Sequence, residues 1–551
     1  MKRLKKIVMA SSITILLGIT FFGAVAFTSD DFKISKSLDV FFTLFRELDI
    51  FYVDKIDPEK LVNTGINAML ESLDPYTEYI PESEKADFDF LTTGKYGGIG
   101  ALIRKNGTNA QIVEIYEGSP AQKAGIRVGD EISFINGTPV GKMEIGEVSS
   151  HLKGDPGSSV KLVLNDSYSD SIFTKVVIRE RIKMPSVPYS GMVQSDVGYV
   201  RLSSFTVGCS DELRLAINDL RNKGAKKLIL DLRGNPGGIL DEAVKIVNFF
   251  VSKNQLVVYT HGKATQFDTK YLTSDQPIDT LMPLVLLVNS SSASASEIVS
   301  GSLQDLDRAV IVGTRTFGKG LVQTTRKLSY GGQLKVTTAK YYIPSGRCIQ
   351  ALDYSHRNPD GSVGHIPDSL IRAFKTKNGR TVYDGGGISP DVYLSSDTLS
   401  TICIKAYSEN RFFDFANIYF RSHPTIPAPS KFVVKDTLIA DFVHYLVKNK
   451  FSYKTEEEAL LDRLDSLVKD DKNGGALQAK VKSLREDVSR GIPELVNKNR
   501  NDFAYFLTDE IVKRYYFQGG TYPAIFKFDS QLSKSIAIID APARYNKLLK
   551  R

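Results

Sequence analysis

A cluster of serines and a distant lysine are the residues of this chain best suited to chemistry. The chain carries Ser292, Ser294 and Ser296 after an apolar run, and Lys319 lies 25 residues after Ser294, between two glycines. A serine hydroxyl becomes a good nucleophile only when a partner takes its proton, and an uncharged lysine amine can do so. Because a free lysine has a pKa of about 10.4, it must be buried to become neutral. The pattern predicts a serine nucleophile with a lysine general base, a pairing that can hydrolyse peptide bonds.

Predicted strands and a helix would position these groups. The apolar run 283–288 indicates a buried strand, and the apolar residues of 297–308 recur at helical spacing. Ser294 would therefore lie on a strand-to-helix turn, where the first amides of the helix favour developing negative charge. Another strand-like run, 309–313, leads to Lys319, whose flanking glycines allow the tight bend that would aim one side chain into a cleft.

A second strand-turn-helix unit precedes the serines. Residues 227–232 indicate a strand, and residues 240–250 indicate an amphipathic helix. Between them lies the loop Arg-Gly-Asn-Pro-Gly-Gly at 233–238. Such a loop exposes backbone amides at the start of a helix, as an oxyanion hole requires.

Each of these motifs also has a plain structural interpretation. Serines before a helix commonly cap its first amides, with Glu297 adding negative charge in the first turn. A Gly-Lys-Gly segment is commonly a solvated turn, and the glycine-rich loop could be an ordinary connection. Residues 313–319 imitate a phosphate-binding loop, but that motif needs Ser or Thr after its lysine and Gly320 stands there. The serine cluster alone favours a helix cap, and only the combination of units favours a catalytic site.

Taken together, these blocks resemble the C-terminal processing peptidases, or tail-specific proteases, of the S41 serine-protease group. The resemblance rests on Ser-Ala-Ser-Ala-Ser-Glu-Ile at 292–298, Thr-Phe-Gly-Lys-Gly-x-Val-Gln at 316–323 and Asp-Leu-Arg-Gly-Asn-Pro-Gly-Gly at 231–238. It covers residues 35–395 and follows the order and spacing of the family. It implies a multidomain α+β protein whose protease core has the β/α fold of the S41 (ClpP/crotonase-like) type.

The resemblance also implies roles for individual residues. Ser294 would be the nucleophile, Lys319 the general base, and Gln323, one helical turn or a short loop further on, would orient the lysine. Asp305 matches a supporting acidic residue that part of the family carries. The oxyanion donors that the resemblance implies are the backbone amides of Ala295 and Gly237. No catalytic position departs from the family pattern.

A β-rich module precedes the catalytic blocks. Turn residues such as Gly-Ser-Pro-Ala at 118–121 and Gly-Asp-Glu-Ile at 129–132 separate short alternating strands, which is typical of a small β domain. The pattern resembles a PDZ domain, which adds an extended peptide to a sheet edge and captures its terminal carboxylate on backbone amides. The resemblance implies a carboxylate-binding loop made of Gly97, Gly98, Ile99 and Gly100, with the apolar Ile99 and Leu102 near the side-chain pocket. We therefore expect this domain to hold the C-terminus of a substrate and deliver the preceding segment to Ser294.

Composition excludes several other classes of protein. The 551 residues, 42% of them hydrophobic, are enough for three to four domains, and the net charge of +8 is spread along the chain, so no nucleic-acid partner is expected. The six histidines form no His-Glu-x-x-His pattern, and no Gly-x-Ser-x-Gly motif occurs. The three cysteines have no metal-like spacing and leave room for one disulfide. We expect neither a metal ion nor a cofactor.

The start of the chain predicts export. Four basic residues between positions 2 and 6 precede an uncharged stretch from 7 to 27, and Ala24-Val25-Ala26 offers a cleavage site. The stretch is also long enough to remain as an anchor in the inner membrane. No cysteine follows it for lipid attachment. Either alternative predicts a periplasmic protein, soluble or held at the membrane.

The expected domain order follows from these patterns. It comprises a signal peptide or anchor (1–27), a helical N-terminal segment (28–87), the PDZ-like domain (88–181), the protease core (182–395) and a mainly helical C-terminal domain (396–551). In the last of these, residues 460–468 and 477–488 show helical spacing on either side of an Asn-Gly-Gly turn, which predicts a helical hairpin packed against the core. The alternative is that the hairpin docks a second copy of the chain or an adaptor.

Two other functions stay open at this stage. One is a catalytically silent scaffold that uses the PDZ-like domain to bind tails. The other is a serine hydrolase of a non-peptide ester. The partners expected in the favoured interpretation are proteins or peptides with free C-termini.

Overall fold

The structure, a computed structural model, describes residues 29–551 except 167, 170, 396 and 470–474. The predicted signal peptide or anchor at 1–27 lies outside the described residues. The chain divides into two compact units, which are residues 1–79 and 80–551. None of the helices in the described ranges has the length and apolar character that a membrane span requires.

The first unit is helical, as predicted. It contains α2 (Ser29–Phe51) and α3 (Pro58–Glu71), and β1 (Glu78–Ile80) follows. Asp57 caps α3, because its carboxylate accepts a hydrogen bond from the Lys60 amide at 3.1 Å, and Pro58 occupies the first helical position. Many apolar side chains of α2, among them Leu38 and Phe42, are exposed.

The second unit begins with α4 (Lys85–Thr93) and a β-rich domain. The strands of this domain are β3 (Ala101–Asn106), β4 (Asn109–Ile115), β5 (Asp130–Ile135), β6 (Thr138–Pro139), β7 (Ser159–Asp166) and β8 (Ser171–Ile178). They form an antiparallel sheet in the order β3-β4-β5-β7-β8, with β6 beside β5. Two short helices, α5 (Pro120–Lys123) and α6 (Ile145–Leu152), complete it. Val148 of α6 packs with Ile112 and Leu162 of the sheet in one apolar core. A neck of two antiparallel strands, β2 (Lys95–Gly98) and β9 (Glu180–Lys183), joins this domain to the rest.

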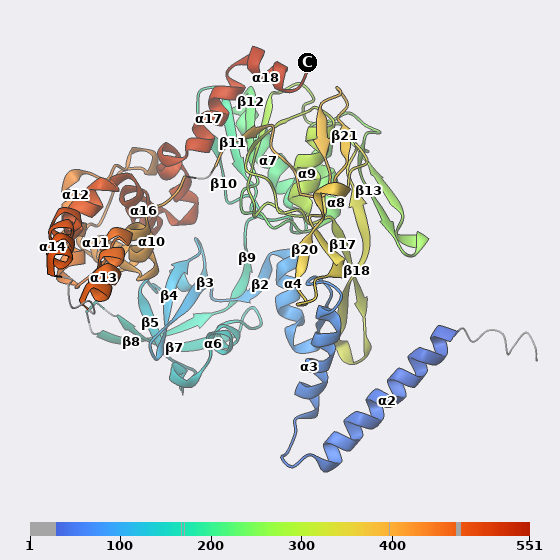
Figure 1. The fold of residues 1–551 in the computed structure, drawn as a ribbon, viewed down its shortest axis with the longest axis horizontal. Helices are drawn as coiled ribbons and strands as arrows, with labels where there is room; N and C mark the ends of the chain where they lie inside the picture. The colour runs from blue at the N-terminus through green and yellow to red at the C-terminus, as the bar shows by residue number, and fades with distance from the viewer. Residues whose placement is uncertain (1–28, 167, 170, 396, 470–474) are drawn as a thin grey trace, which may run out of the picture. The chain divides into compact units, whose positions relative to one another are not determined.

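A parallel sheet forms the centre of the next domain (Figure 1). Its strands are β10 (Tyr189–Met192), β11 (Val197–Arg201), β12 (Lys227–Asp231), β15 (Leu284–Val288), β16 (Val310–Gly313) and β23 (Val392–Tyr393). They lie side by side in this order, all parallel except β10. The three strands predicted from apolar runs are therefore confirmed as β12, β15 and β16. Their continuous apolar sequences follow from burial on both faces of the sheet.

Helices cover both faces of the central sheet. One face packs against α7 (Cys209–Asn222), α8 (Leu240–Asn248) and α9 (Ala295–Asp305) through residues such as Leu230 and Leu286. The other face packs against α17 (Ser530–Ile539) and α18 (Pro542–Leu548) through neighbours such as Ile229 and Leu287. Successive side chains of a strand point to opposite faces, which explains this alternation.

A second, antiparallel sheet lies beside the parallel one. Its strands are β13 (Leu256–Gly262), β14 (Thr269–Leu272), β17 (Leu321–Lys327) and β18 (Gln333–Tyr342). β18 pairs with both β17 and β13, and β13 pairs with β14. Two small strand pairs follow, β19 (Leu352–Arg357) with β20 (Val363–His365) and β21 (Ala373–Lys375) with β22 (Thr381–Tyr383).

The C-terminal domain is mainly helical, as predicted. It contains α10 (Thr401–Ser408), α11 (Arg411–Ser422), α12 (Asp436–Lys448), α13 (Glu456–Lys469), α14 (Gly475–Val488), α15 (Ile492–Lys498) and α16 (Arg500–Ile525). The helices α17 and α18, which were predicted as part of this domain, instead pack on the central sheet of the protease domain. The core of the C-terminal domain is aromatic, since the rings of Phe412 and Phe442 stack with centroids 4.9 Å apart beside Phe503.

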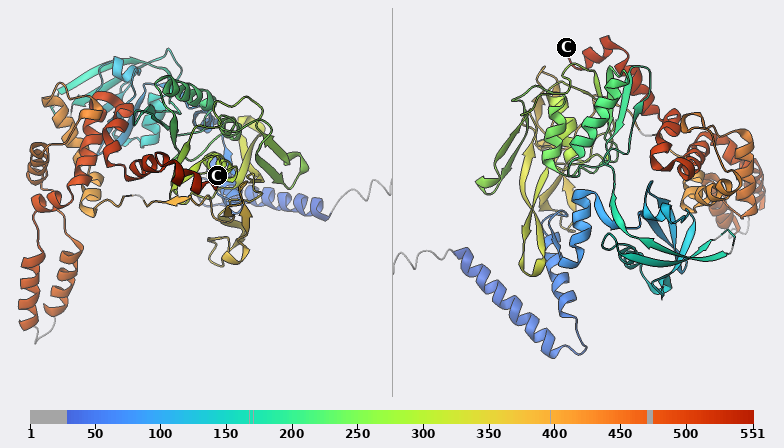
Figure 2. Two further views of the ribbon diagram at one scale, coloured as in Figure 1. Left: turned by 90° about the horizontal axis from the view of Figure 1, so that it is seen from above. Right: turned by 180° about the vertical axis from the view of Figure 1, so that it is seen from behind.

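The predicted helical hairpin is present as α13 and α14. The two helices pack against each other, and an ion pair between Arg485 and Asp462 joins them. Figure 2 shows the hairpin extending away from the other helices of its domain. The expectation that it packs against the core is therefore wrong. The reason is that its buried valines, Val468 and Val481, are covered within the pair while Leu460 and Leu467 stay exposed.

Candidate active site

The turn after β15 separates the three serines by role. The hydroxyl of Ser292 donates to the Leu232 carbonyl at 2.8 Å, and that of Ser296 donates to the Asn235 carbonyl at 3.0 Å. Both side chains are buried, so they hold the loop that follows β12 rather than meet a substrate. Ser294 is the partly exposed member of the cluster. Its φ of 54° is strained for a residue with a side chain, as is common at functional turns.

A buried carboxylate organises this turn. Glu297 accepts hydrogen bonds from the amides of Ser294 (2.8 Å), Lys319 (2.9 Å) and Gly318 (2.7 Å), and from the hydroxyl of Thr316 (2.5 Å). The Ser294 and Lys319 amides share the same oxygen, Oε2. Burial raises the pKa of Glu297 to about 7, although these donors favour its charged form. Glu297 is thus the link that brings the serine turn and the lysine loop together.

A tyrosine provides a second link between the same two residues. The hydroxyl of Tyr341, on β18, lies 2.7 Å from the Lys319 carbonyl and 3.2 Å from the Ser294 carbonyl. Burial raises the pKa of Tyr341 well above its usual value, and the Glu297 carboxylate adds to this effect, so the hydroxyl remains a donor. Lys319 itself is partly buried. The predicted nucleophile and base therefore lie on adjoining segments of one site.

The loop after β12 lies against the serine turn. The backbone carbonyl of Asn235 accepts a hydrogen bond from the Ala293 amide at 3.0 Å. The side-chain amide of Asn235 donates to the Leu202 carbonyl at 2.9 Å. At the base of the loop, Asp231 is fully buried and pairs with Arg233 and Arg201. Burial opposes ionisation of Asp231, but the two arginines hold its pKa well below the usual range. This cluster of ion pairs anchors the loop to the end of the central sheet.

The predicted oxyanion donors differ in their availability. A Cβ on Gly237 would lie 2.8 Å from that of Ser294 and 2.9 Å from the Ala295 nitrogen, so this glycine touches the nucleophile turn. Its own amide, however, donates to the Asn235 side chain at 2.9 Å. Within the described part of the chain, no acceptor receives the amides of Ala295 or Gly238. The Gly237 amide is therefore engaged within its own loop, because the short Asn235 side chain turns back onto it.

Two predicted supporting residues lie in unexpected places. Gln323 is on strand β17 rather than on a helix or loop, and its side-chain amide donates to Thr337 of β18 at 3.2 Å. Asp305 ends α9, at the opposite end of this helix from Ser294. There it pairs with the buried Arg347 at 2.9 Å and accepts from the Ser345 amide at 3.0 Å. Asp305 therefore supports the frame of the domain and not the reacting groups directly.

The predicted carboxylate-binding loop divides into two parts. Gly97 and Gly98 belong to the neck strand β2 and pair with β9. The Ile99 side chain is buried in the core of the β-rich domain, so it does not line a pocket. Gly100 has a φ of 73°, and a Cβ there would meet Ser119 at 2.4 Å, so only glycine suits this position. Among the described residues, no acceptor is found for the amides of Ile99 and Gly100.

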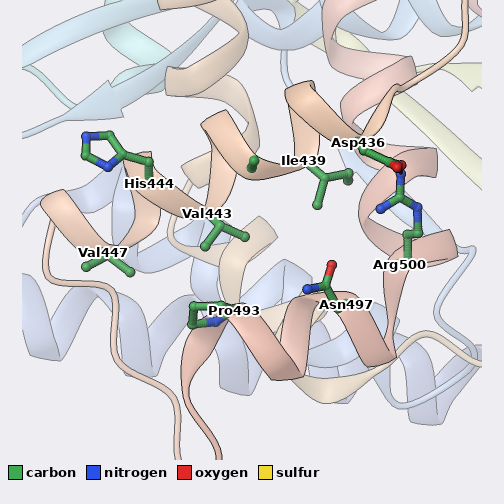
Figure 3. A pocket seen from close by; sticks show the side chains of 9 residues that line it. Asp436, Ile439, Val443, His444, Val447, Pro493, Asn497 and Arg500 are labelled. Atoms are coloured by element: carbon green, nitrogen blue, oxygen red, sulfur yellow. Dashed lines mark hydrogen bonds and ion pairs between the residues drawn. The ribbon is translucent and has the colours of Figure 1, made fainter.

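Cavities elsewhere carry no comparable chemistry. One cavity, of about 560 Å³, lies between α12 and α15. Figure 3 shows that Ile439 and Val443 face Pro493 in it. At its edge, Arg500 pairs with Asp436. A larger cavity of about 920 Å³ is lined by Asp231 at the end of β12 and by Arg233 at the start of the loop that follows it. In the described ranges, no group of three or more metal-binding side chains occurs. All three cysteines are free thiols, so the one disulfide left open by the sequence is not formed.

Comparison with known proteins identifies the family. The profile of "Peptidase family S41" matches residues 196–361, that of "PDZ domain" matches 111–166, and that of "Probable PDZ-protease, C-terminal helical domain" matches 402–539. The "Carboxy-terminal-processing protease" of Bartonella bacilliformis is 37% identical over 356 residues, which are 63% of this chain and 77% of that relative. This chain belongs to the S41 family of carboxy-terminal processing proteases.

Another relative agrees with this membership. "Carboxy-terminal processing protease CtpA" of Bacillus subtilis is 34% identical over 306 residues, covering 55% of this chain and 65% of that relative. A solved structure titled "Photosystem II D1 C-terminal processing protease" is 29% identical, with a TM-score of 0.34 over 66% of this chain and 94% of the other. The predicted S41 core with a PDZ domain and a helical C-terminal domain is confirmed. The protein is a serine-type peptidase of this family.

Sequence reasoning missed three residues of the protease site. It treated Glu297 as first-turn charge only, and it assigned no role to Tyr341 or Asn235. One signal was available for Glu297, since a glutamate three residues after a helix-capping serine commonly reaches back to the cap amide. No local pattern marks Tyr341, because its hydroxyl meets Ser294 and Lys319 only through the pairing of β18 with β17.

Proposed function

We propose that this protease cuts substrates near their C-termini with Ser294 as nucleophile and Lys319 as general base. The observation that carries the proposal is the double link between these residues, through one oxygen of Glu297 and through the Tyr341 hydroxyl. Two backbone segments held in this way can keep a nucleophile and its base in register. Gln323, which lies on β17 four residues after Lys319, orients the lysine in this proposal.

The proposed reaction follows the general scheme of serine peptidases. Neutral Lys319 takes the proton of the Ser294 hydroxyl as its oxygen attacks the scissile carbonyl. The amides of Ala295 and Gly238 stabilise the oxyanion. The ammonium of Lys319 then protonates the leaving amine, and an acyl-enzyme remains. Water attacks the ester as Lys319 accepts its proton, and this proton finally returns to Ser294.

The PDZ domain provides the proposed tail-binding site. The amides of Ile99 and Gly100 lie at the start of β3, where a carboxylate can accept from them. Leu102, which follows on the strand, is half exposed and suits an apolar side chain of the tail. The basic and apolar start of the chain supports a periplasmic location for this activity.

The test compares the wild-type protein with Ser294→Ala and Lys319→Ala. The substrate is an unstructured polypeptide with a free C-terminal valine, and mass spectrometry identifies the fragments. We expect each variant to lose at least about 10³-fold in kcat. Binding of a tail peptide to the PDZ domain should stay unchanged in both.

The neighbouring serines offer matched controls. Ser291 is exposed, so Ser291→Ala should keep wild-type activity. A twin substrate whose C-terminus is amidated tests the role of the tail, and we expect its kcat/KM to fall. Retained cleavage by Ser294→Ala would refute the nucleophile, and equal cleavage of both substrates would refute tail recognition.

A further inference from the structure

The PDZ domain is attached at two separate places within the second unit. One attachment is the neck formed by β2 and β9. The pairing continues beyond these strands, because the Gly94 carbonyl accepts a hydrogen bond from the Met184 amide at 2.9 Å. The other is helix α11 of the C-terminal domain. We propose that α11 is a latch that fixes the orientation of the PDZ domain, so that a captured tail presents one defined stretch of substrate to Ser294. This inference rests on the proposed function.

The first half of the latch involves strand β3. Arg104 donates hydrogen bonds to Asn410, the residue before α11, and to Gln111 at 2.6 Å. The guanidinium of Arg104 also lies over the ring of Phe413, 4.2 Å from its centroid. A planar guanidinium can stack on a ring and donate to oxygens at the same time. The beginning of α11 is therefore tied to the strand that would receive a substrate peptide.

The second half lies at the other end of α11. Arg421 pairs with Asp166 and lies over the ring of Tyr168, 4.7 Å from its centroid. The side chain of Asn417 donates to the Tyr168 hydroxyl at 3.0 Å and accepts from Arg514 of α16 at 2.7 Å. Asn417 and Asp166 are both buried at this contact, whereas Arg421 reaches Asp166 from the exposed side. Two contacts, one toward each end of one helix, resist both tilting and twisting of the PDZ domain.

The latch is polar, and this distinguishes it from a domain core. Within the described ranges, the apolar cluster of the PDZ domain and that of the helical domain share no residue. Interfaces of this kind between domains normally permit relative motion. Without the latch, the two-stranded neck would remain as a pivot. The few arginine contacts along α11 therefore decide whether a bound tail is held at one distance from Ser294 or at several.

The experiment measures where the enzyme cuts. The probe is an unstructured polypeptide that ends in valine and repeats one cleavable segment at increasing distance from its C-terminus. The proteins compared are the wild type, Arg104→Ala, Arg421→Ala and the double variant. We expect the wild type to favour one segment, and the double variant to lose about half of that product to neighbouring segments. The rate at which each variant cleaves the amidated twin substrate should stay within about twofold of the wild-type rate.

Controls separate the latch from folding and from the proposed function. Arg490→Ala removes an arginine of the same domain whose ion pair with Glu494 is exposed, and it should cut like the wild type. Thermal unfolding and tail-peptide binding show that each variant is folded, and the single variants remain informative if the double variant is not. If the variants gave the wild-type product pattern, or if their rates changed equally at every segment, the inference that α11 is a latch would be overturned. Loss of tail dependence in the wild type would instead overturn the proposed function.

Discussion

At the scale of single residues, the site depends on a buried carboxylate that does not touch the substrate. The Glu297 carboxylate accepts hydrogen bonds from three backbone amides and one hydroxyl. Two of those amides belong to the proposed nucleophile and base. A glutamine cannot replace it, since one end of an amide is itself a donor and would face donors. We therefore infer that Glu297 is a positioning residue whose charge state sets the geometry of the proposed dyad.

We predict that Glu297→Gln lowers kcat at least about 10²-fold, because small displacements of reacting groups carry losses of this size. Tail-peptide binding should not change, since Glu297 is in the protease domain. Peptide hydrolysis and calorimetric binding measure the two quantities. Glu297→Gln with wild-type kcat would show that the links do not position the dyad.

The pKa of Glu297 also predicts two pH dependences. With this pKa raised by burial to about 7, kcat should fall as the pH drops through 7, because a protonated carboxyl no longer accepts from all four donors. The sign for stability is opposite. Between about pH 4.5 and 7 the folded protein binds this proton more tightly than the unfolded chain, so the free energy of unfolding should decrease as the pH rises. Urea titrations at several pH values should show this slope in the wild type and a reduced one in Glu297→Gln.

At the scale of elements, two turns at the ends of β12 and β15 meet at close range. The Asn235 carbonyl accepts from the turn after β15, and Ser292 and Ser296 donate to the segment 232–235. Gly237 completes the contact because it leaves no room for a side chain. Adjacent parallel strands end at the same edge of a sheet, and this places the two turns side by side.

Gly237→Ala tests this contact against a matched control. Gly237 and Gly224 both have a φ of 97°, but a Cβ at Gly237 would meet the Ser294 turn whereas one at Gly224 has open space within 4 Å. We predict that both variants lose roughly 1–2 kcal/mol of stability through backbone strain, and that the clash with backbone atoms of the Ser294 turn adds to the loss in Gly237→Ala. Only Gly237→Ala should also lose kcat, by about 10²–10³-fold. Thermal unfolding and peptide hydrolysis measure these effects, and equal activities would contradict the assigned contact.

At the scale of the whole second unit, the end of the chain completes the protease domain. α17 and α18 cover one face of the central sheet, and the Tyr545 hydroxyl bonds with both the amide and the carbonyl of Leu284. The Leu549 side chain is fully buried, and its carbonyl accepts from Asn378 at 2.8 Å. Residues 530–549 are thus held on the central sheet of the protease domain.

Leu549→Ala should lower the free energy of unfolding by about 2–5 kcal/mol, as is usual for a buried leucine. Leu281→Ala, at a leucine that is 85% exposed, is the control and should change it by less than about 0.5 kcal/mol. Urea unfolding measures both. If the two variants were equally stable, the C-terminal helices would not belong to the core of the protease domain.

The amino-acid pattern was enough to predict the main strands and the candidate chemistry. Uninterrupted apolar runs predicted β12, β15 and β16, because strands buried on both faces carry no polar alternation. The resemblance of three short blocks singled out Ser294, Lys319 and the loop after β12, and the comparisons confirmed the family. Local periodicity reports burial, so it could predict where strands, helices and their connecting turns occur.

The way in which these parts are held together became visible only in the folded chain. Glu297 meets Lys319 across 22 residues, Gln323 lies on a strand, and Asp305 pairs with Arg347 at the far end of α9. The folding of residues 530–548 onto the central sheet likewise has no local signature. The physical reason is that such contacts join segments distant in sequence, so their partners are set by packing and sheet pairing rather than by the pattern of either segment alone.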